Sequence, residues 1–365
     1  MSGTSEIKRI AFLGDVHLGS YPVALDKGLA ALLQECAHVV VNLESPICKP
    51  CPRDSSKILL QSEPGVESSL SDWHVTCATL ANNHIFDYGA EGFHDTCEAL
   101  RSRQIVFAGA GDNLGKASHP LILDCVGTRV GIIPCTESVT QAQIATPNTP
   151  GCNHLRFPEI GYQVRNLKAK VDFLIVAPHW GFCDYAYPPT RVVSVGEQLL
   201  EAGADMIIGH HSHVLQGIRQ EGDGRQVFYS LGNFYFNTYK AHGRVVEPSD
   251  ENRKGLVVIV EFADEMYPKI YPVFIRQSNR VVRLDMSAAR EMQCQYRSAP
   301  LRSLETYPGH WQSVVRKRLL RRAFYWLSPP NWRHIRPCII QAGLNMVLGS
   351  TFCRSRENNV QHSNE

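Results

Sequence analysis

The sequence lacks a long apolar run. No stretch reaches the roughly 18 consecutive apolar residues that a membrane-spanning helix requires, and residues 1–9 contain no apolar core of the kind found in signal peptides. We therefore expect no transmembrane segment and no secretory leader. The expected location is the cytoplasm, with peripheral attachment to a membrane as an alternative.

Several familiar catalytic signatures are also absent. The chain has no GxSxG motif, which presents the nucleophile of many serine hydrolases. Residues 109–116 partly resemble a phosphate-binding loop, but Ala110 stands where that loop needs glycine and Ala117 replaces its serine or threonine. The sequence thus shows neither a serine-hydrolase elbow nor the site of an ATP-dependent ligase.

The twelve cysteines follow no disulfide or zinc-ribbon pattern. Several of them, such as Cys36, Cys125 and Cys135, lie within apolar runs and no export signal accompanies them, so we expect reduced and mostly buried thiols. Cys48 and Cys51 form a single CxxC without a second pair, which favours a loop over a metal or redox site.

The chain has 365 residues, of which 44% are apolar and 20% charged, as in ordinary globular proteins. Helical periodicity over residues 25–36, 93–100 and 191–202 alternates with short strand-like runs, which predicts an α/β fold with parallel strands and right-handed crossovers. Further along, residues 226–236 are predicted to form a strand running into a Gly-Asn turn. We expect the main domain to end near residue 285.

The C-terminal segment, residues 286–365, differs from the rest in charge. Residues 306–356 contain nine Lys or Arg and no Asp or Glu, so the remainder, with 28 basic and 35 acidic residues, has a formal net charge of −7. Residues 311–327 can be drawn as a basic amphipathic helix, which Ser328-Pro-Pro-Asn331 would end. Such a helix can pack on the main domain or lie on an anionic membrane surface, and residues 357–365 are expected to be disordered.

Side chains able to bind metals follow the ends of several predicted strands. They are Asp15 and His17 after Ile10, Asn42 and Glu44 after Val39, Asn83 and His84 after Leu80, His179 after Val171, and His211 and His213 after Asp205. An isolated His-x-His pair is more often solvated than a ligand, but here the other groups would meet it, because the carboxyl ends of parallel strands share one edge of a sheet. This pattern predicts a metal site at that edge.

Six motifs occur in order within residues 10–236: GDVHLG, VNLESPI, LANNHIFDYG, APHWGF followed by YPP, IIGHHSHVLQG and FYSLGNFYF. Together they resemble the motif series of the CapA-type capsule and poly-γ-glutamate biosynthesis family, a branch of the calcineurin-like metallophosphatase superfamily. Members of that family usually carry a glutamate and an aromatic residue shortly after the His-Trp-Gly turn, where this chain has Phe182, Cys183, Asp184 and Tyr185. The sequence leaves open whether Asp184 takes the place of that glutamate.

The resemblance implies a four-layer αββα metallophosphatase-like sandwich, followed here by the basic and mainly helical C-terminal extension. It also implies two metal positions, the first on Asp15, His17 and His213 and the second on Asn83, His179 and His211, with Glu44 bridging them and Asn42 nearby as a further ligand. The same resemblance makes His84 the group that protonates a leaving oxygen, and makes Asp87 a second catalytic candidate.

Mixed oxygen and nitrogen ligands favour two ions of Mn, Fe, Zn or Co over Ca. Two such ions about 3.5 to 4 Å apart can clamp the attacking and leaving oxygens of a phosphoryl group. The expected function is therefore that of a metal-dependent hydrolase of phosphoesters in capsule or poly-γ-glutamate-type polymer metabolism, with a phosphorylated or polymeric substrate and no specific nucleic-acid partner. The alternative is a non-catalytic component that binds a polymer, a membrane or a polymer-synthesis complex. Binding to a membrane or to a synthesis complex would use residues 306–356.

Overall fold

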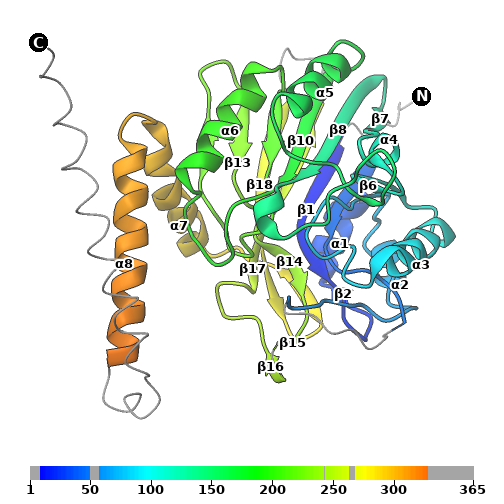
Figure 1. Ribbon diagram of the computed structural model, residues 1–365, viewed down its shortest axis with the longest axis horizontal. Helices are drawn as coiled ribbons and strands as arrows, with labels where there is room; N and C mark the ends of the chain where they lie inside the picture. The colour runs from blue at the N-terminus through cyan, green and yellow to red at the C-terminus, as the bar shows by residue number, and fades with distance from the viewer. Residues whose placement is uncertain (1–8, 50–56, 242, 263–267, 328–365) are drawn as a thin grey trace, which may run out of the picture. The chain divides into compact units, whose positions relative to one another are not determined.

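The computed structural model describes residues 9–49, 57–241, 243–262 and 268–327. The chain divides into two units, residues 1–307 and residues 308–365. The first unit contains two large β-sheets and all the predicted site residues, and Figure 1 shows its strands and helices by label.

The larger sheet has nine strands in the order β2, β19, β18, β17, β1, β3, β4 and β5, with β14 also paired to β1. Their bounds are Ala24–Leu25 for β2, Val281–Leu284 for β19, Lys269–Ser278 for β18, Lys254–Glu261 for β17, Arg9–His17 for β1, His38–Leu43 for β3, Cys77–Thr79 for β4, Val106–Ala108 for β5 and Asn233–Phe236 for β14. Strands β1, β3, β4 and β5 run parallel to their neighbours in this group. The parallel direction of these four strands thus brings their carboxyl ends to one edge.

The smaller sheet has six strands in the order β12, β13, β11, β10, β8 and β7. Their bounds are Ile218–Gln220 for β12, Gln226–Phe228 for β13, Met206–Ile208 for β11, Phe173–His179 for β10, Thr128–Thr136 for β8 and Leu121–Cys125 for β7. Two two-stranded pairs stand apart: β15 (Tyr239–Ala241) with β16 (Arg244–Val246), and β6 (Ala110–Gly111) with β9 (Gly151–Cys152).

The described part of the chain contains helices of very different length. They are α1 (Lys27–Gln34), α2 (Ser68–Asp72), α3 (Gly89–Ser102), α4 (Leu114–Ala117), α5 (Glu159–Lys168), α6 (Thr190–Glu201), α7 (Ala288–Ser298) and α8 (Tyr307–Leu327), with short 3₁₀ turns at Ser138–Thr140 (η1) and Ala299–Arg302 (η2). Buried residues of α1, α2 and α3 pack on the nine-stranded sheet, and α5 and α6 contact strands of the six-stranded sheet. In Figure 1 these two sets of helices stand on opposite sides of the strands.

Strand β1 shows why the molecule is layered in this way. Its side chains alternate between two faces, because successive residues of a strand point to opposite sides. Ala11 and Leu13 belong to the apolar cluster shared with the helices, whereas Ile10 and Phe12 belong to the cluster shared with the other sheet. Both faces are covered, so a run that is nearly all apolar can form a strand in the middle of the molecule.

The mixed α/β class predicted from the sequence is confirmed. Helices α1 and α6 lie within two residues of the predicted ranges 25–36 and 191–202, and α3 begins four residues before the predicted range 93–100. One prediction is wrong in part. Residues 226–236 do not form one strand, because β13 joins the six-stranded sheet and β14 pairs with β1 in the nine-stranded sheet. The chain crosses between the sheets at residues 229–232, where Gly232 has a φ of 66°.

The first unit also extends beyond residue 285, where we expected the main domain to end. Helix α7 is attached to it through the buried guanidinium of Arg297, which donates to the carbonyl of Leu215 and to Glu251 Oε2 at 2.8 Å. A charged side chain in a distant helix makes these contacts, so hydrophobic patterning could not reveal them.

Helix α8 is the helix predicted at residues 311–327, and it begins four residues earlier. Two further predictions fall outside the described residues: the break at Ser328-Pro-Pro-Asn331 and the disorder at residues 357–365. Cys51, the second cysteine of the CxxC, also lies outside them. Within the described part of the chain, no helix is both long enough and apolar enough to cross a membrane.

Candidate metal centre

All the predicted site residues lie at or just beyond the carboxyl ends of strands. Asp15 and His17 close β1, Asn42 lies in β3 with Glu44 one residue past its end, and His179 closes β10. The remaining residues follow β4 and β11 in loops. This edge is where open α/β sheets usually bind their ligands.

Two glycines allow the backbones to come this close. A Cβ on Gly14 would lie 2.2 Å from the carbonyl oxygen of Gly232, so only glycine lets β1 approach the turn before β14. A Cβ on Gly209 would lie 2.2 Å from the carbonyl oxygen of Tyr229. Gly14 directly precedes Asp15, and Gly209 lies two residues before His211. These close approaches explain why the motifs GDVHLG and IIGHHSHVLQG have glycine at these positions.

Asp15 is fully buried and organises one half of the centre. Its Oδ1 accepts a hydrogen bond from Asn42 Nδ2 at 2.8 Å and lies 2.9 Å from His210 Nδ1, although that ring N–H is not aligned for a hydrogen bond. Its Oδ2 accepts from the backbone N–H of His211 at 3.0 Å. Burial alone would raise the pKa of Asp15, but these partners and the nearby His213 hold the pKa below its usual value.

Glu44 is the residue shared by both halves. It is fully buried, and within the described part of the chain neither carboxylate oxygen has a hydrogen-bond partner. Its Oε1 lies 3.5 Å from His213 Nε2, 3.8 Å from His179 Nε2 and 4.0 Å from His84 Nε2. Burial raises the pKa of Glu44 well above its usual value. A buried carboxylate without hydrogen-bond donors needs a compensating positive charge.

His179 and His211 form the other half together with Asn83. His179 Nε2 lies 2.7 Å from Asn83 Oδ1 and 3.0 Å from His211 Nδ1, so three atoms that can each bind a metal lie close together. Burial and the neighbouring imidazoles hold the pKa of His179 well below its usual value. A neutral imidazole is the form that binds a metal.

His213 connects the two carboxylates. Its Nδ1 lies 3.0 Å from Asn233 Oδ1 and 3.5 Å from Asp15 Oδ2. Burial disfavours its charged form, yet Glu44 and the other acidic groups raise the pKa of His213 well above its usual value. His211 and His213 have φ values of 91° and 57°, in the region that side chains rarely adopt. Strain of this kind costs on the order of 1–3 kcal/mol per residue and persists where the surroundings impose it.

The predicted metal ligands do not all belong to groups of side chains close enough to bind one ion. Among the described residues, donor atoms within 4.8 Å of one another group Asp15, Glu44 and His213 together, and Glu44, His179 and His211 together. His17 belongs to neither group; it is buried, its Nδ1 has no hydrogen-bond partner in the described structure, and burial lowers its pKa to about 3.

Asn42 has a different place from the one expected for a ligand. It directs its amide nitrogen toward Asp15 and His179, while its oxygen accepts from Thr79 and Asn82. In this orientation Asn42 positions Asp15 rather than offering its oxygen to the centre.

His84 and Asp87 form a pair beside Glu44. His84 Nδ1 lies 2.6 Å from Asp87 Oδ2, which also accepts from the backbone N–H of Leu60 at 2.7 Å. Lys57 Nζ lies 2.5 Å from the other carboxylate oxygen. Burial lowers the pKa of His84 to about 4 against the opposing effect of Asp87. Both Lys57 and Leu60 lie in the irregular segment between β3 and α2.

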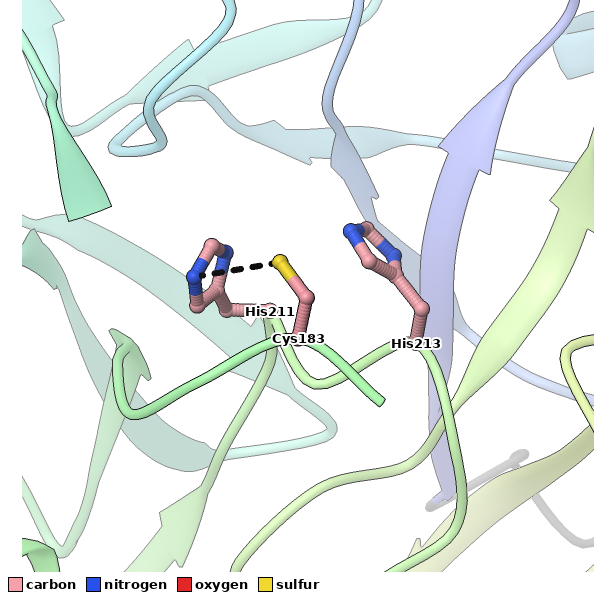
Figure 2. A group of neighbouring side chains, drawn as sticks. All are labelled: Cys183, His211 and His213. Atoms are coloured by element: carbon pink, nitrogen blue, oxygen red, sulfur yellow. Dashed lines mark hydrogen bonds between the residues drawn. The ribbon is translucent and has the colours of Figure 1, made fainter. Parts of the chain in front are cut away.

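The loop after β10 contributes a residue that the sequence did not assign to the site. Cys183 Sγ lies 3.6 Å from His211 Nε2, and Cys183, His211 and His213 form a third group of donor atoms within 4.8 Å of one another (Figure 2). Partial desolvation of the thiol opposes its ionisation, but the neighbouring imidazoles lower the pKa of Cys183 to about 5. Asp184 accepts from Asn252 Nδ2 at 2.9 Å, and it is Cys183 that is grouped with the two histidines.

These residues fit a pair of divalent cations. The deciding observation concerns Glu44. Neither of its buried carboxylate oxygens has a hydrogen-bond partner among the described residues, and Glu44 belongs both to the group with Asp15 and His213 and to the group with His179 and His211. Carboxylate oxygen and neutral imidazole are suitable ligands for Mn, Fe, Zn and Co. The residues that would hold the ions are Asp15, Glu44, Asn83, His179, His211 and His213.

Comparison with known proteins shows the family to which this chain belongs. The sequence matches the family described as "Bacterial capsule synthesis protein PGA_cap" over residues 9–238. The chain belongs to this family. The matched residues contain every predicted ligand, and the family confirms the resemblance seen in the six motifs.

Curated relatives include two CapA proteins. Capsule biosynthesis protein CapA of Bacillus anthracis is 30% identical over 213 residues, which are 56% of this chain and 52% of that protein. PGA biosynthesis protein CapA of Bacillus subtilis (strain 168) is 30% identical over 247 residues, 64% of each chain. A probable polyglutamine synthesis accessory protein of Mycobacterium tuberculosis is 29% identical over 235 residues, 59% of this chain and 61% of that one. The chain therefore spans from about half to just under two thirds of the length of these relatives.

Solved structures similar to this one include a hypothetical protein from Thermus thermophilus, at 15% identity and a TM-score of 0.45, covering 74% of this chain and 100% of that chain. A putative 5′-nucleotidase from Staphylococcus aureus is 16% identical with a TM-score of 0.45, covering 79% of this chain and 58% of that chain.

Proposed function

We propose that this protein is a divalent-metal-dependent hydrolase of phosphoesters that acts in the metabolism of a capsule or poly-γ-glutamate-type polymer. In this proposal the two sheets and their outer helices form a metallophosphatase-like four-layer sandwich with the dinuclear centre at its strand ends. The observation that carries the proposal is the position of Glu44, which is fully buried without hydrogen-bond donors and belongs to two groups of candidate ligands.

Bound cations would supply electrophilic stabilisation of a phosphoryl group and lower the pKa of water. The chain itself supplies proton transfer at His84 Nε2, which faces Glu44 at 4.0 Å. Asp87 keeps the ring in place through Nδ1, so the other nitrogen is left to exchange a proton with the substrate oxygen. This division of roles suits hydrolysis with a leaving oxygen that needs a proton.

The alternative is a non-catalytic member of the family that binds a polymer or a synthesis complex. A structural metal site would need the ligand groups but would not need a buried His84 held beside them by Asp87, which Lys57 contacts in turn. That arrangement favours the enzyme. The names of the relatives connect them with capsule or polymer biosynthesis, and the proposal extends that pathway to this chain.

The test combines metal analysis with activity. Wild-type protein, Glu44→Gln and His211→Ala are purified, and their metal content is measured beside their phosphodiesterase and phosphomonoesterase rates with Mn²⁺, Zn²⁺ or Co²⁺ added in turn. We expect two ions per wild-type chain, and loss of metal and activity together in both variants. A wild type that takes up these ions but hydrolyses neither class of ester with any of them would favour the binding function instead.

The basic segment, residues 306–356, is proposed to contact an anionic membrane surface or the polymer-synthesis complex. A deletion should begin after Tyr307 rather than before it, because the buried Tyr307 hydroxyl donates to the carbonyl of Pro188 at 2.6 Å. Sedimentation with anionic vesicles should fall in the deletion variant, and the wild type should bind neutral vesicles weakly. A wild type that ignores anionic vesicles would overturn the membrane part of the proposal.

A further inference from the structure

Cys183 differs from the other cysteines that the structure describes. It is exposed, whereas the others are buried. It lies in the loop after β10, four residues beyond His179, where Gly181 has a φ of 85°. The turn at this glycine directs the thiol back over the edge of the sheet. In Figure 2 the sulfur lies between the imidazole rings of His211 and His213.

The position of the sulfur relates it to both halves of the centre. His211 belongs to the group with Glu44 and His179, and His213 belongs to the group with Asp15 and Glu44. Cys183 forms a third group with these same two histidines. The thiol therefore reaches one imidazole from each half, and it does so from the side that is open to solvent.

The distance between sulfur and nitrogen agrees with joint coordination of one ion. Two ligands of a tetrahedral zinc, with Zn–S near 2.3 Å and Zn–N near 2.0–2.1 Å, are about 3.6 Å apart. Cys183 Sγ and His211 Nε2 are 3.6 Å apart, and His211 Nδ1 is the nitrogen that faces His179, so an ion shared with Cys183 would be held through the other side of the ring. An independent observation also points to a cation here, because the unpartnered carboxylate of Glu44 is fully buried and lies 3.5 Å from His213.

We propose that Cys183 is a metal ligand, and that with His211 and His213 it makes the centre selective for a thiophilic divalent ion such as Zn²⁺, Fe²⁺ or Co²⁺ over Mn²⁺ or Mg²⁺. Thiolate sulfur and imidazole nitrogen select softer ions, whereas carboxylate, carbonyl and water suit Mg²⁺ and Mn²⁺. The inference rests on the proposed metal centre and adds to it a ligand and a metal class.

The experiment uses cobalt as the probe, because a thiolate bound to Co²⁺ gives a near-ultraviolet charge-transfer absorption that nitrogen and oxygen ligands do not give. Metal-free wild type, Cys183→Ser and Cys36→Ser are each reconstituted with Co²⁺, and the bound cobalt is counted by elemental analysis. Cys36 is the matched control, since this buried cysteine precedes β3 and lies at the opposite end of that strand from Glu44. We expect the absorption in the wild type and Cys36→Ser, and its loss in Cys183→Ser.

The outcomes separate this inference from the proposed function. Full cobalt loading without the thiolate absorption, or with the absorption kept in Cys183→Ser, would overturn the ligand role and leave the metal centre standing. Cys183 would then act only through its contact with His211. A wild type that binds no divalent ion would overturn both.

Competition between metals gives a second measurement that does not need activity. The ratio of Zn²⁺ to Mn²⁺ affinity should fall by about 10- to 100-fold in Cys183→Ser, the range found when groups supporting a metal site are removed. Cys36→Ser should keep the wild-type ratio. An unchanged ratio in Cys183→Ser would contradict the proposed selectivity. Thermal unfolding of the metal-free proteins shows whether each variant is folded.

Discussion

Asp87 holds His84 and Lys57 at the same time, with one carboxylate oxygen 2.6 Å from the imidazole Nδ1 and the other 2.5 Å from the ammonium group. The imidazole is fixed through Nδ1, so Nε2 faces Glu44 and the candidate ligands. This arrangement keeps the proposed proton-transfer group apart from the candidate metal ligands, so the two proposed roles can be tested independently.

Replacement of His84 by alanine should leave the metal content unchanged and lower turnover. His84 belongs to none of the groups of candidate ligands, and loss of a general acid or base typically costs about 10²- to 10⁴-fold in rate. Steady-state kinetics together with elemental analysis would measure both effects. A variant that loses metal would show that His84 is a ligand, and an unchanged rate would end its proposed catalytic role.

Replacement of Lys57 by methionine should raise the pKa of His84. The positive charge of Lys57 is one of the causes that keep this pKa near 4, so its removal favours the protonated ring. NMR titration of the metal-free protein would follow the imidazole directly. Lys116→Met is the control, because Lys116 pairs with the exposed Asp112 on the surface beside α4. A fall in the His84 pKa would contradict the prediction.

The candidate ligands could be predicted from the sequence because strand ends are local features. An apolar run followed by Asp, Asn or His indicates where a strand stops, and parallel strands bring such ends together. Cys183 and Lys57 gave no comparable signal, since each lies in an irregular loop whose course depends on tertiary contacts. The single strand predicted at residues 226–236 was wrong for the same reason. The local sequence indicated a strand but could not show that its two halves join different sheets.

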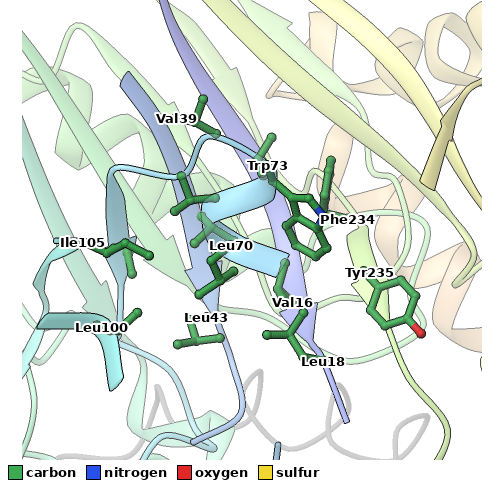
Figure 3. Packing of buried hydrophobic residues seen from close by; sticks show 14 of the residues in the cluster. Val16, Leu18, Val39, Leu43, Leu70, Trp73, Leu100, Ile105, Phe234 and Tyr235 are labelled. Atoms are coloured by element: carbon green, nitrogen blue, oxygen red, sulfur yellow. The ribbon is translucent and has the colours of Figure 1, made fainter. Parts of the chain in front are cut away.

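Trp73 should be required for the stability of the region around β14. It is 1% exposed, its ring lies 5.0 Å from that of Phe234, and its Nε1 donates to the carbonyl of Val23 at 2.9 Å (Figure 3). Trp73→Ala should lower the free energy of unfolding by about 3–5 kcal/mol, the cost usual for removing a large buried ring. Urea denaturation measures this, with the exposed Tyr162→Ala as control. A loss below about 1 kcal/mol, of the order of a surface substitution, would show that the ring is not well packed.

Glu251 should make stability depend on pH in the acid range. Its partial burial raises the carboxyl pKa, but hydrogen bonds from Lys254 and Arg297 outweigh this and lower the pKa to about 2. A pKa below the unfolded value stabilises the native state above about pH 4.5, and the contribution is lost as the pH falls toward 2.

Because the Glu251 side chain is 42% exposed, solvent screening reduces the effect to about 1 kcal/mol. Glu251→Gln should therefore be less stable than the wild type at pH 7, and the difference should shrink as the pH is lowered from about 5 to about 3. Urea denaturation across this range would follow the difference, with Glu247→Gln as control because Glu247 is 73% exposed and its contact with Arg253 is longer, at 3.6 Å. A constant difference at every pH would mean that the substitution acts on the attachment of α7 through shape and not through charge.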